Sequence, residues 1–263
     1  GGMCGYNNSG NISNCYYTGA ISGSGAYVGG VCGSGDGGEI SNCYSAGTVR
    51  GSSHVGGVCG YNSGEISNCY HTGAVIGSTY YAGGVCGYNV GPIFNCYNTG
   101  AVRGDDTVGG VCGETYGYIG NCYSTGAVSG NNCIGGVCGV SSFSGTISNI
   151  YFDSEKCEKG AFGYFDQGTV TNVEGKTTAQ FESGEVCYLL NEGKTDGTQI
   201  WYQNLTPETG DQSPIWKATG GNTVYQVTKY SGCEHDPGTS IELYSNLNKD
   251  IYEGYTSEGT CSH

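Results

Sequence analysis

Cysteine is the residue type with the most chemistry to offer in this chain. The 263 residues include 16 cysteines and a single methionine. Thiols can join as disulfides or bind zinc, and a dense, regular set of them is typical of an oxidising compartment. Eleven recur in two sequence contexts, GGVCG-like and NCY: Cys4, Cys15, Cys32, Cys43, Cys59, Cys69, Cys86, Cys96, Cys112, Cys122 and Cys138. We therefore expect a secreted protein that disulfides stabilise.

The two cysteines of one repeat lie 10 or 11 residues apart. This separation lets the chain double back and bring the two Cα atoms to the roughly 5.5 Å that a disulfide needs. Each short loop closed in this way would contribute on the order of 2 to 3 kcal/mol. Two alternatives stay open: bridges such as Cys43–Cys59 between successive repeats, and free thiols that pack as small apolar side chains. The favoured pairs are Cys4–Cys15, Cys32–Cys43, Cys59–Cys69, Cys86–Cys96 and Cys112–Cys122.

Some cysteines do not follow this scheme. Cys138 has no NCY partner, because Ile150 replaces that cysteine. The sequence assigns no partner to Cys133, Cys157 or Cys187 either.

Two Cys-x-His pairs near the end of the sequence, Cys233 with His235 and Cys261 with His263, could together bind zinc. In an oxidising compartment a Cys233–Cys261 disulfide is favoured instead. We therefore expect no metal and no cofactor.

No motif indicates catalysis. HExxH and GxSxG are absent, and no histidine stands beside a pair of carboxylates. His54 and His71 occupy repeat positions where other copies hold Tyr, Thr or Ser, and we expect both at the surface. The glycine-rich run 33–38 lacks the Lys and the helix of a phosphate-binding loop, so it should form a turn. We expect a protein that is not an enzyme.

The elements that position these residues follow from an internal repeat. The GGVCG cysteines recur every 26 to 28 residues. This period is shorter than that of the common helical repeats, and glycine closes each short run of β-forming residues. One such unit cannot bury its own apolar face, whereas coils stacked about 4.8 Å apart can. We expect an all-β chain that forms a β-solenoid, with one coil per 26–28 residues.

Three columns of apolar residues should line this solenoid, and a fourth column, of tyrosines, recurs in register with them. The isoleucine column is Ile12, Ile40, Ile66, Ile93, Ile119 and Ile147. The second column is Ile21, Val49, Val75, Val102 and Val128. The third is Met3, Val31, Val58, Val85, Val111 and Val137. The tyrosines of NCY, which could face a ligand, are Tyr16, Tyr44, Tyr70, Tyr97 and Tyr123, with Tyr151 in the degraded sixth copy. Because strand side chains alternate, a buried valine beside a buried cysteine requires a bend at the glycine pair.

We divide the chain at the end of the repeats. Residues 1–152 should form the solenoid, 153–229 a small mixed capping domain, and 230–263 a cysteine-containing tail. Within the second region, residues 177–191 have helix-like features, with Thr177 or Thr178 as the cap and Gly184 as an interruption. Trp201 and Trp216 are expected to be packing anchors rather than platforms for sugars.

The repeat GGVCGYNSGEISNCYHTGAVIG at residues 56–77 resembles the GLUG-motif repeat of secreted bacterial adhesin-like surface proteins. Similar repeats stand beside the peptidase domain of some IgA-cleaving enzymes. The resemblance covers about residues 1–152 and implies a right-handed β-solenoid, a surface or secreted location and a structural or adhesive role. It brings no catalytic residues. Cysteine replaces the aliphatic residue that many relatives have in the glycine-rich element.

Charge narrows the choice of partners. The net charge is −14 with only nine Lys and Arg, which excludes nucleic acid because phosphate contacts need a basic face. The acidic residues of the repeats are scattered, which favours a solvated surface over a calcium site. No stretch is apolar enough to span a membrane.

Three functions remain: an extracellular stalk or filament subunit, a carbohydrate-binding adhesin that uses the tyrosine column, and a non-catalytic part of a larger secreted enzyme. Residue 1 is the first glycine of a repeat, so the first coil offers an unpaired edge. We expect further repeats of a longer protein there, or a second copy in a head-to-tail filament. We favour a structural or adhesive surface protein, whose partners would be itself or glycans at a cell surface.

Overall fold

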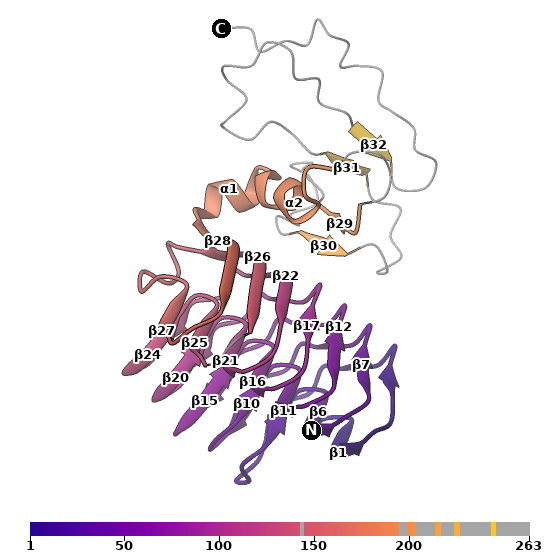
Figure 1. Ribbon diagram of the computed structural model, residues 1–263. Coiled ribbons are helices and arrows are strands. Elements are labelled where there is room, and N and C mark those ends of the chain that lie inside the picture. The colour runs from indigo at the N-terminus through magenta and orange to yellow at the C-terminus, as the bar shows by residue number, and fades with distance from the viewer. Residues whose placement is uncertain (143–144, 195–198, 204–213, 217–223, 227–242, 246–263) are drawn as a thin grey trace, which may run out of the picture. The chain divides into compact units, whose positions relative to one another are not determined.

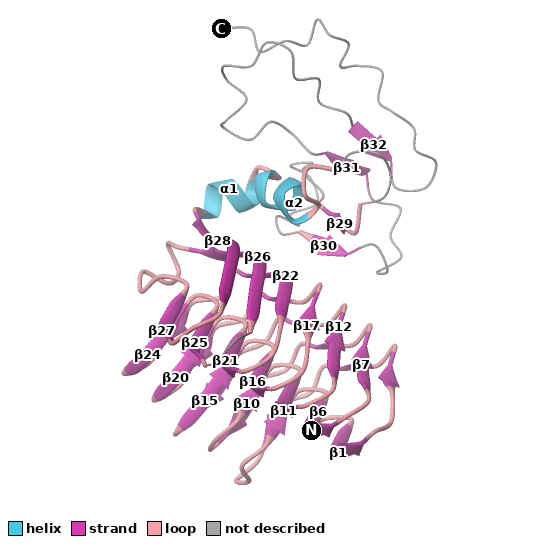
Figure 2. Cartoon of the chain, viewed as in Figure 1, coloured by secondary structure: helices cyan, strands magenta, loops and turns pink. Residues whose placement is uncertain are grey.

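The computed structural model describes residues 1–142, 145–194, 199–203, 214–216, 224–226 and 243–245. The chain divides into two compact units, Gly1–Gly175 and Lys176–His263. The first unit is a β-solenoid, which confirms the predicted fold class (Figure 1). In the described part of the chain, both helices lie in the second unit (Figure 2).

Each central coil of the solenoid passes through four sheets, numbered here in chain order from the cysteine strand. Sheet 1 contains β1 (Cys4–Asn8), β6 (Cys32–Asp36), β11 (Cys59–Asn62), β16 (Cys86–Asn89), β21 (Cys112–Thr115), β25 (Cys138–Ser141) and β27 (Phe162–Phe165). Sheet 2 contains β2 (Ile12–Ser13), β3 (Tyr16–Tyr17), β7 (Glu39–Ser41), β8 (Tyr44–Ser45), β12 (Glu65–Ser67), β13 (Tyr70–His71), β17 (Ile93–Phe94), β18 (Tyr97–Asn98), β22 (Ile119–Ser124), β26 (Thr146–Asp153) and β28 (Thr169–Lys176).

The other two sheets complete the coil. Sheet 3 contains β4 (Ile21–Ser22), β9 (Val49–Gly51), β14 (Val75–Gly77), β19 (Val102–Arg103) and β23 (Val128–Ser129). Sheet 4 contains β5 (Val28–Gly29), β10 (Val55–Gly56), β15 (Tyr80–Gly83), β20 (Asp106–Gly109) and β24 (Asn132–Gly135).

Strands of successive coils pair in parallel and in register, so equivalent residues form columns. Cys59 is the partner of Cys32 on one side and of Cys86 on the other. Ile66 likewise lies between Ile40 and Ile93. The 26- to 28-residue period of the sequence is thus the length of one coil.

Asparagine makes a sharp corner within sheet 2. The Asn of every NCY-like triplet has a left-handed backbone, with φ between 50° and 55°. Asn tolerates this conformation better than other residues with a side chain, because its short polar group can hydrogen-bond locally. The six corner residues are Asn14, Asn42, Asn68, Asn95, Asn121 and Asn149.

A second corner lies at the glycine pair before each cysteine. Val58 and Cys59 are both fully buried. Their backbone N–H groups donate to the same carbonyl oxygen, that of Val85, at 2.8 and 3.0 Å. The chain therefore bends between sheets 4 and 1, which confirms that the glycine pair lets adjacent side chains both point inward.

The core has two apolar parts. One lies between sheets 1 and 2 and includes Cys59 and Ile66; the other lies between sheets 3 and 4 and includes Val55 and Val75. His71 is fully buried, which corrects its expected surface position. A Cβ added to Gly57 would overlap the His71 ring, so the second glycine of the pair leaves room for the side chain opposite it.

The solenoid continues beyond the predicted boundary at residue 152. Strand β27 pairs with β25, and Phe162 stands in the column of Cys138. Strand β28 pairs with β26. Because the coil after residue 152 lacks GGVCG and NCY, the repeat pattern does not reveal it, and the structural boundary lies at Gly175.

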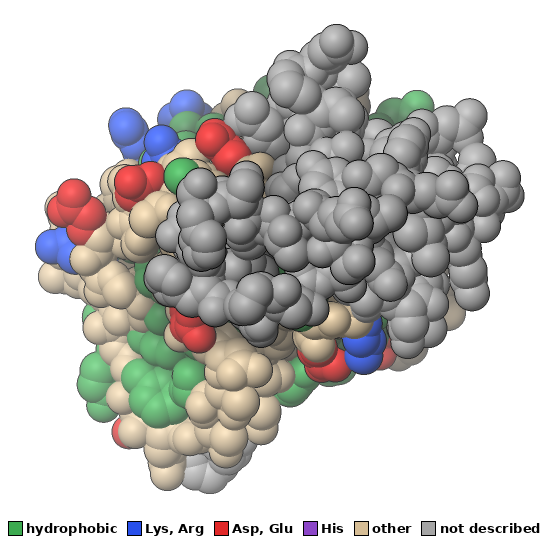
Figure 3. All heavy atoms as spheres, turned by 90° about the horizontal axis from the view of Figure 1, so that it is seen from above, with side chains coloured by type: hydrophobic (Ala, Val, Ile, Leu, Met, Phe, Trp, Pro, Cys, Tyr) green, Lys and Arg blue, Asp and Glu red, His purple; other side chains and the backbone are tan. Residues whose placement is uncertain are grey.

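Few charges decorate the solenoid. Arg50 and Arg103 are its basic residues before residue 143, and both are exposed on strands of sheet 3. Acidic and basic side chains lie near one another on the face shown in Figure 3, where grey atoms cover much of the view. The visible residues of this face therefore do not form a continuous patch of positive or negative charge.

The second unit begins with two short helices, α1 (Thr178–Glu182) and α2 (Glu185–Leu190). As predicted, Thr177 caps the first helix in a capping box with Gln180, and Gly184 separates the helices with a φ of 87°. Paired strands follow: β29 (Trp201–Tyr202) with β30 (Ile215–Trp216), and β31 (Val224–Gln226) with β32 (Leu243–Ser245).

Trp201 is 1% exposed, which confirms it as a packing anchor. The Trp216 side chain lies outside the described part of the structure, as do Cys233, His235, Cys261 and His263, so what the sequence predicts for them stays a prediction. The capping role of the second unit also remains a prediction. Within the described ranges, no helix combines the length and apolar character needed to cross a membrane.

Candidate functional site

The tyrosines of NCY form a stacked ladder along sheet 2. The ring centroids of Tyr44 and Tyr70 lie 4.8 Å apart with an interplanar angle of 5°, and those of Tyr70 and Tyr97 lie 4.7 Å apart with an angle of 1°. Tyr16 and Tyr123 extend the stack at spacings of 5.1 and 4.9 Å. Each inner ring therefore has both faces against neighbouring rings.

This ladder is a poor ligand surface along most of its length. Tyr16 is 61% exposed, whereas Tyr97 is 5% and Tyr123 0% exposed. Burial and the neighbouring Tyr44 raise the pKa of Tyr70 to about 12. The prediction that these tyrosines face a ligand is thus corrected for Tyr97 and Tyr123, and stacking leaves little free ring face on the others.

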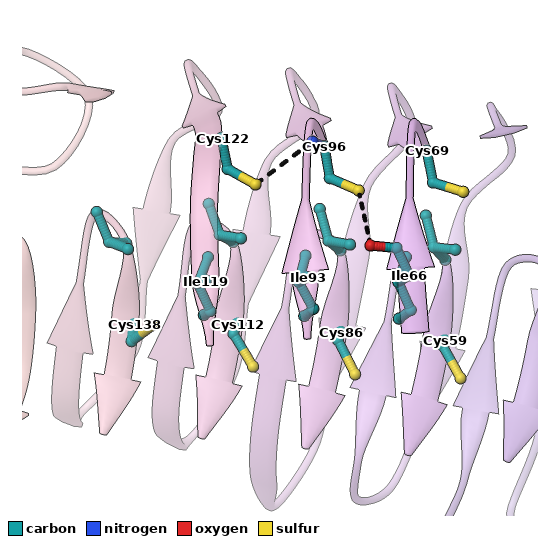
Figure 4. Close-up of a cluster of buried hydrophobic side chains, with 14 of the residues drawn as sticks. Cys59, Ile66, Cys69, Cys86, Ile93, Cys96, Cys112, Ile119, Cys122 and Cys138 are labelled. Atoms are coloured by element: carbon teal, nitrogen blue, oxygen red, sulfur yellow. Dashed lines mark hydrogen bonds between the residues drawn. The ribbon is translucent and has the colours of Figure 1, made fainter. Parts of the chain in front are cut away.

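The expected disulfides are absent from the structure. The 14 cysteines among the described residues are free thiols. Figure 4 shows why the two cysteines of a coil do not meet: Cys86 and Cys96 lie on opposite sides of Ile93. The Cys43–Cys59 alternative is not formed either, and the third possibility, buried thiols that pack as small apolar groups, describes the structure. Cys157 and Cys187, whose partners the sequence left open, are also buried.

The buried thiols have hydrogen-bond partners in their own coil. Cys59 donates from Sγ to the carbonyl oxygen of Tyr61 at 2.9 Å, two residues later. Cys69 donates to the carbonyl oxygen of Ser67 at 3.1 Å, two residues earlier. Burial and the neighbouring thiols raise the pKa of Cys86 and Cys96 well above the usual value. Cys86 and Cys96 are therefore protonated and unreactive at neutral pH while they stay buried.

A different group of aromatic residues gathers at the outer corner between sheets 4 and 1. We call it the aromatic surface, and it consists of Tyr27, His54, Tyr61, Tyr81, Tyr88 and Tyr116. Tyr27 is 48% and Tyr116 41% exposed, and the other four are partly exposed. Residues up to 89 positions apart in sequence meet here because the coils stack.

Two residues hold this surface together. The His54 ring lies 4.9 Å from that of Tyr27, 4.8 Å from that of Tyr81 and 5.5 Å from that of Tyr88. Tyr88 also contacts Tyr61 at 5.7 Å and Tyr116 at 5.6 Å. Most of these contacts are edge-on or tilted, so the rings do not cover one another as those of the ladder do. The exposed parts of these side chains offer aromatic surface to a ligand.

The backbone at this surface is unusual. His54 and Tyr81 have positive φ angles of 48° and 60°. At the equivalent position of the next coils, Thr107 and Cys133 have φ angles of 57° and 45°. Side chains other than Gly and Asn are uncommon in this region and tend to gather at functional sites, where the surrounding structure holds them.

A carboxylate stands beside the rings. Glu114 is 8% exposed and accepts a hydrogen bond from the Ser142 hydroxyl at 3.0 Å. Burial and the charge of Glu114 raise the pKa of Tyr81. Burial lowers the pKa of His54, and Glu114 partly opposes this shift. At neutral pH the surface therefore presents phenol hydroxyls and a neutral imidazole, and Glu114 lies buried beside them.

The sequence carries a weak signal for this surface. The signal is separate from the cysteine and NCY patterns. Tyrosine recurs two residues after the cysteine, at Tyr6, Tyr61 and Tyr88, and His54 shares its repeat position with Tyr27 and Tyr81. Spacing alone does not show that these two columns meet at one corner. The expectation that His54 lies at the surface holds in part, since its ring is partly buried among tyrosines.

The histidines contact serines but not as a catalytic triad. His54 Nδ1 lies 2.8 Å from the hydroxyl of the adjacent Ser53, and buried His71 Nδ1 lies 3.2 Å from that of Ser45. Within the described ranges no carboxylate is hydrogen-bonded to either imidazole, and no three His, Cys, Asp or Glu residues are placed to hold a metal ion.

Comparison with known proteins identifies the repeat. Residues 24–50 and 51–76 each match the family model of the GLUG motif. The chain is also similar to a crystal structure from Bacteroides ovatus that carries the name "putative immunoglobulin A1 protease", with 20% sequence identity and a TM-score of 0.50. That alignment covers 80% of this chain and 76% of the other, and at such identity it shows a shared fold. No curated protein matches the chain.

Proposed function

We propose that this chain, which carries GLUG-motif repeats wound into a β-solenoid, is a non-catalytic extracellular surface protein that binds glycans through its aromatic surface. The observation that carries the proposal is the cluster around His54 and Tyr88, in which aromatic side chains from several coils stay partly exposed. Tyrosine offers a large contact area with few rotatable bonds, and its hydroxyl can hydrogen-bond. These are properties that suit the alternating apolar and hydroxyl faces of a sugar ring.

Charge supports a neutral sugar over an anionic one. Glu114 lies buried beside the aromatic surface, and Asp36 accepts a hydrogen bond from the Tyr6 hydroxyl at 3.2 Å. The two arginines of the solenoid before residue 143 stand on strands β9 and β19 of another sheet. Carboxylates accept hydrogen bonds from sugar hydroxyls and repel sulfated or sialylated chains.

A glycan array followed by binding isotherms would test this function. We expect saturable binding of the native chain to a neutral glycan, weakened at least about tenfold by Tyr88→Ala or Tyr81→Ala. Tyr16→Ala is the matched control, because it removes an exposed tyrosine of the ladder and should leave binding unchanged. Absence of binding to any glycan, or loss of binding in Tyr16→Ala alone, would overturn the proposal.

The protease name of the similar structure suggests a second role, as a non-catalytic part of a larger secreted enzyme. Only the shared fold favours it at 20% identity. Both roles predict that the chain by itself leaves immunoglobulin A1 intact, so the glycan-binding isotherms separate them: the second role requires no glycan site.

A further inference from the structure

Sulfur atoms of successive coils lie side by side in both cysteine columns. In sheet 1, the thiol of Cys59 interacts with the thiols of Cys32 and Cys86. In the NCY column, the backbone N–H of Cys96 donates to Sγ of Cys122 at 3.3 Å. Cys59 and Cys96 thus each have the sulfur of an equivalent cysteine one coil away as a neighbour, and Cys138 also interacts with Cys122 of the other column.

The two cysteines of a single coil are kept apart by the core. Ile93 lies between Cys86 and Cys96, and Ile66 lies between Cys59 and Cys69 (Figure 4). Both isoleucines are fully buried and belong to the same apolar cluster as the cysteines. A bridge within a coil would need this column to leave the core, whereas a bridge along a column would not.

We propose that oxidation joins equivalent cysteines of successive coils, such as Cys59 with Cys86 and Cys69 with Cys96, so that the disulfides run along the solenoid axis. Neighbouring strands lie about 4.8 Å apart, which falls within the Cα separation that disulfides span, about 4.4 to 6.8 Å. The in-register pairing of Cys59 with Cys86 provides this relation directly. These bonds are independent of glycan binding.

The reaction needs an oxidant, which we take to be a low-molecular-weight disulfide. The thiolate of Cys86 attacks one sulfur of the oxidant, which forms a mixed disulfide and releases one thiol. The thiolate of Cys59 then attacks Sγ of Cys86, which forms the protein disulfide and releases the second thiol. The two cysteines lose two protons and two electrons, and the two released thiols carry them away. Because the thiols are buried, the reaction proceeds as neighbouring coils open.

Peptide mapping of the full chain tests the pairing. The reduced protein is incubated with excess oxidised glutathione, alkylated and digested with chymotrypsin. Cleavage after Tyr61, Tyr70, Tyr88 and Phe94 places Cys59, Cys69, Cys86 and Cys96 on four separate peptides. We expect the dominant cross-links of Cys59 to join cysteines of its own column, and likewise for Cys69. Dominant Cys59–Cys69 or Cys86–Cys96 links, or complete alkylation after oxidation, would overturn the proposal.

A single substitution gives a second, independent readout. In Cys86→Ala, pairing along columns leaves Cys96 cross-linked to Cys69 or Cys122. Pairing within coils would instead leave Cys96 without a partner and open to alkylation. Circular dichroism before and after oxidation checks that the solenoid is intact, and the map of the native chain decides the outcome if the variant does not fold.

Discussion

Two positions in the central coils have a left-handed backbone, and they carry different side chains. The Asn of NCY fills the first, where a short polar group makes positive φ tolerable. His54 and Tyr81 fill the second, although most side chains cost about 1 to 2 kcal/mol in this conformation. Thr107 and Cys133 have the same conformation in the following coils, so the turn recurs along the solenoid, and only its aromatic occupants His54 and Tyr81 belong to the aromatic surface.

His71 should make the solenoid sensitive to acid. Burial lowers its pKa from 6.5 to about 4, and its Nε2 has no hydrogen-bond partner. Because the folded pKa lies below the unfolded one, the unfolded chain binds the proton first as pH falls. We expect this contribution to stability to be complete above pH 6.5 and to decline towards pH 4, by up to about 3 kcal/mol. Urea denaturation at pH 7 and pH 4.5 measures it.

The matched control for this prediction is His71→Asn. Asn98 occupies the equivalent position one coil later, where it donates to the carbonyl oxygen of Gly100 at 2.7 Å. The variant should fold and should lose less stability between pH 7 and pH 4.5 than the native chain. An equal loss in both proteins would assign the acid sensitivity to carboxylates instead.

At the scale of elements, the glycine pair determines how closely coils approach. A Cβ at Gly57 would overlap the carbonyl oxygen of Gly84 in the next coil as well as the His71 ring. Neither can move without breaking the parallel pairing of sheet 4 or exposing the His71 side chain. Glycine is therefore required at this position for space.

Gly57→Ala should consequently lower the free energy of unfolding by about 3 kcal/mol or more. Gly25→Ala is the control, because a Cβ there would meet no atom within 4 Å. Chemical denaturation of both variants compares them. Similar stabilities would mean that the coils can spread apart locally at little cost.

The direction of the disulfides also matters at this scale. A bond between Cys59 and Cys86 closes a loop of about 27 residues, which the chain-entropy account values at about 3 to 4 kcal/mol. A bond within a coil closes a shorter loop and is worth less. Bonds along the columns would in addition tie neighbouring coils together, which bonds within a coil cannot do.

At the scale of the whole molecule, stability comes from contacts between neighbouring coils, as in other solenoids. The N–H of Val58 and that of Val85 each donate to the next coil at 2.8 Å from fully buried residues. Strand β28, in contrast, consists of exposed and partly exposed residues. Central coils should thus open less often than the end of the solenoid.

Hydrogen exchange followed by mass spectrometry checks this expectation. Peptides that contain Val58 or Val85 should exchange roughly 100-fold more slowly, or slower still, than peptides from β28. Uniform exchange along residues 1–175 would show instead that the solenoid opens as one cooperative unit. The head-to-tail filament predicted from the sequence stays a prediction at this scale.

The sequence by itself determined the repeat, its period and the columns of equivalent residues. Asn at each NCY corner, glycine before each cysteine and Thr177 before the first helix also act locally, so they could be recognised without the fold. Hydrophobic isoleucines at equal spacing predicted a column that the structure buries. Each of these features depends on residues close in sequence or on exact repetition of one unit.

Only the tertiary structure decided which columns face each other. The number of residues between two side chains does not tell which way the chain turns once glycine bends the backbone. The separation of Cys59 from Cys69 by Ile66 could therefore not be predicted. The aromatic surface arises for the same reason, since Tyr27, His54 and Tyr88 belong to three different coils. Burial of His71 and stacking of Tyr97 likewise depend on coils above and below, which no single repeat contains.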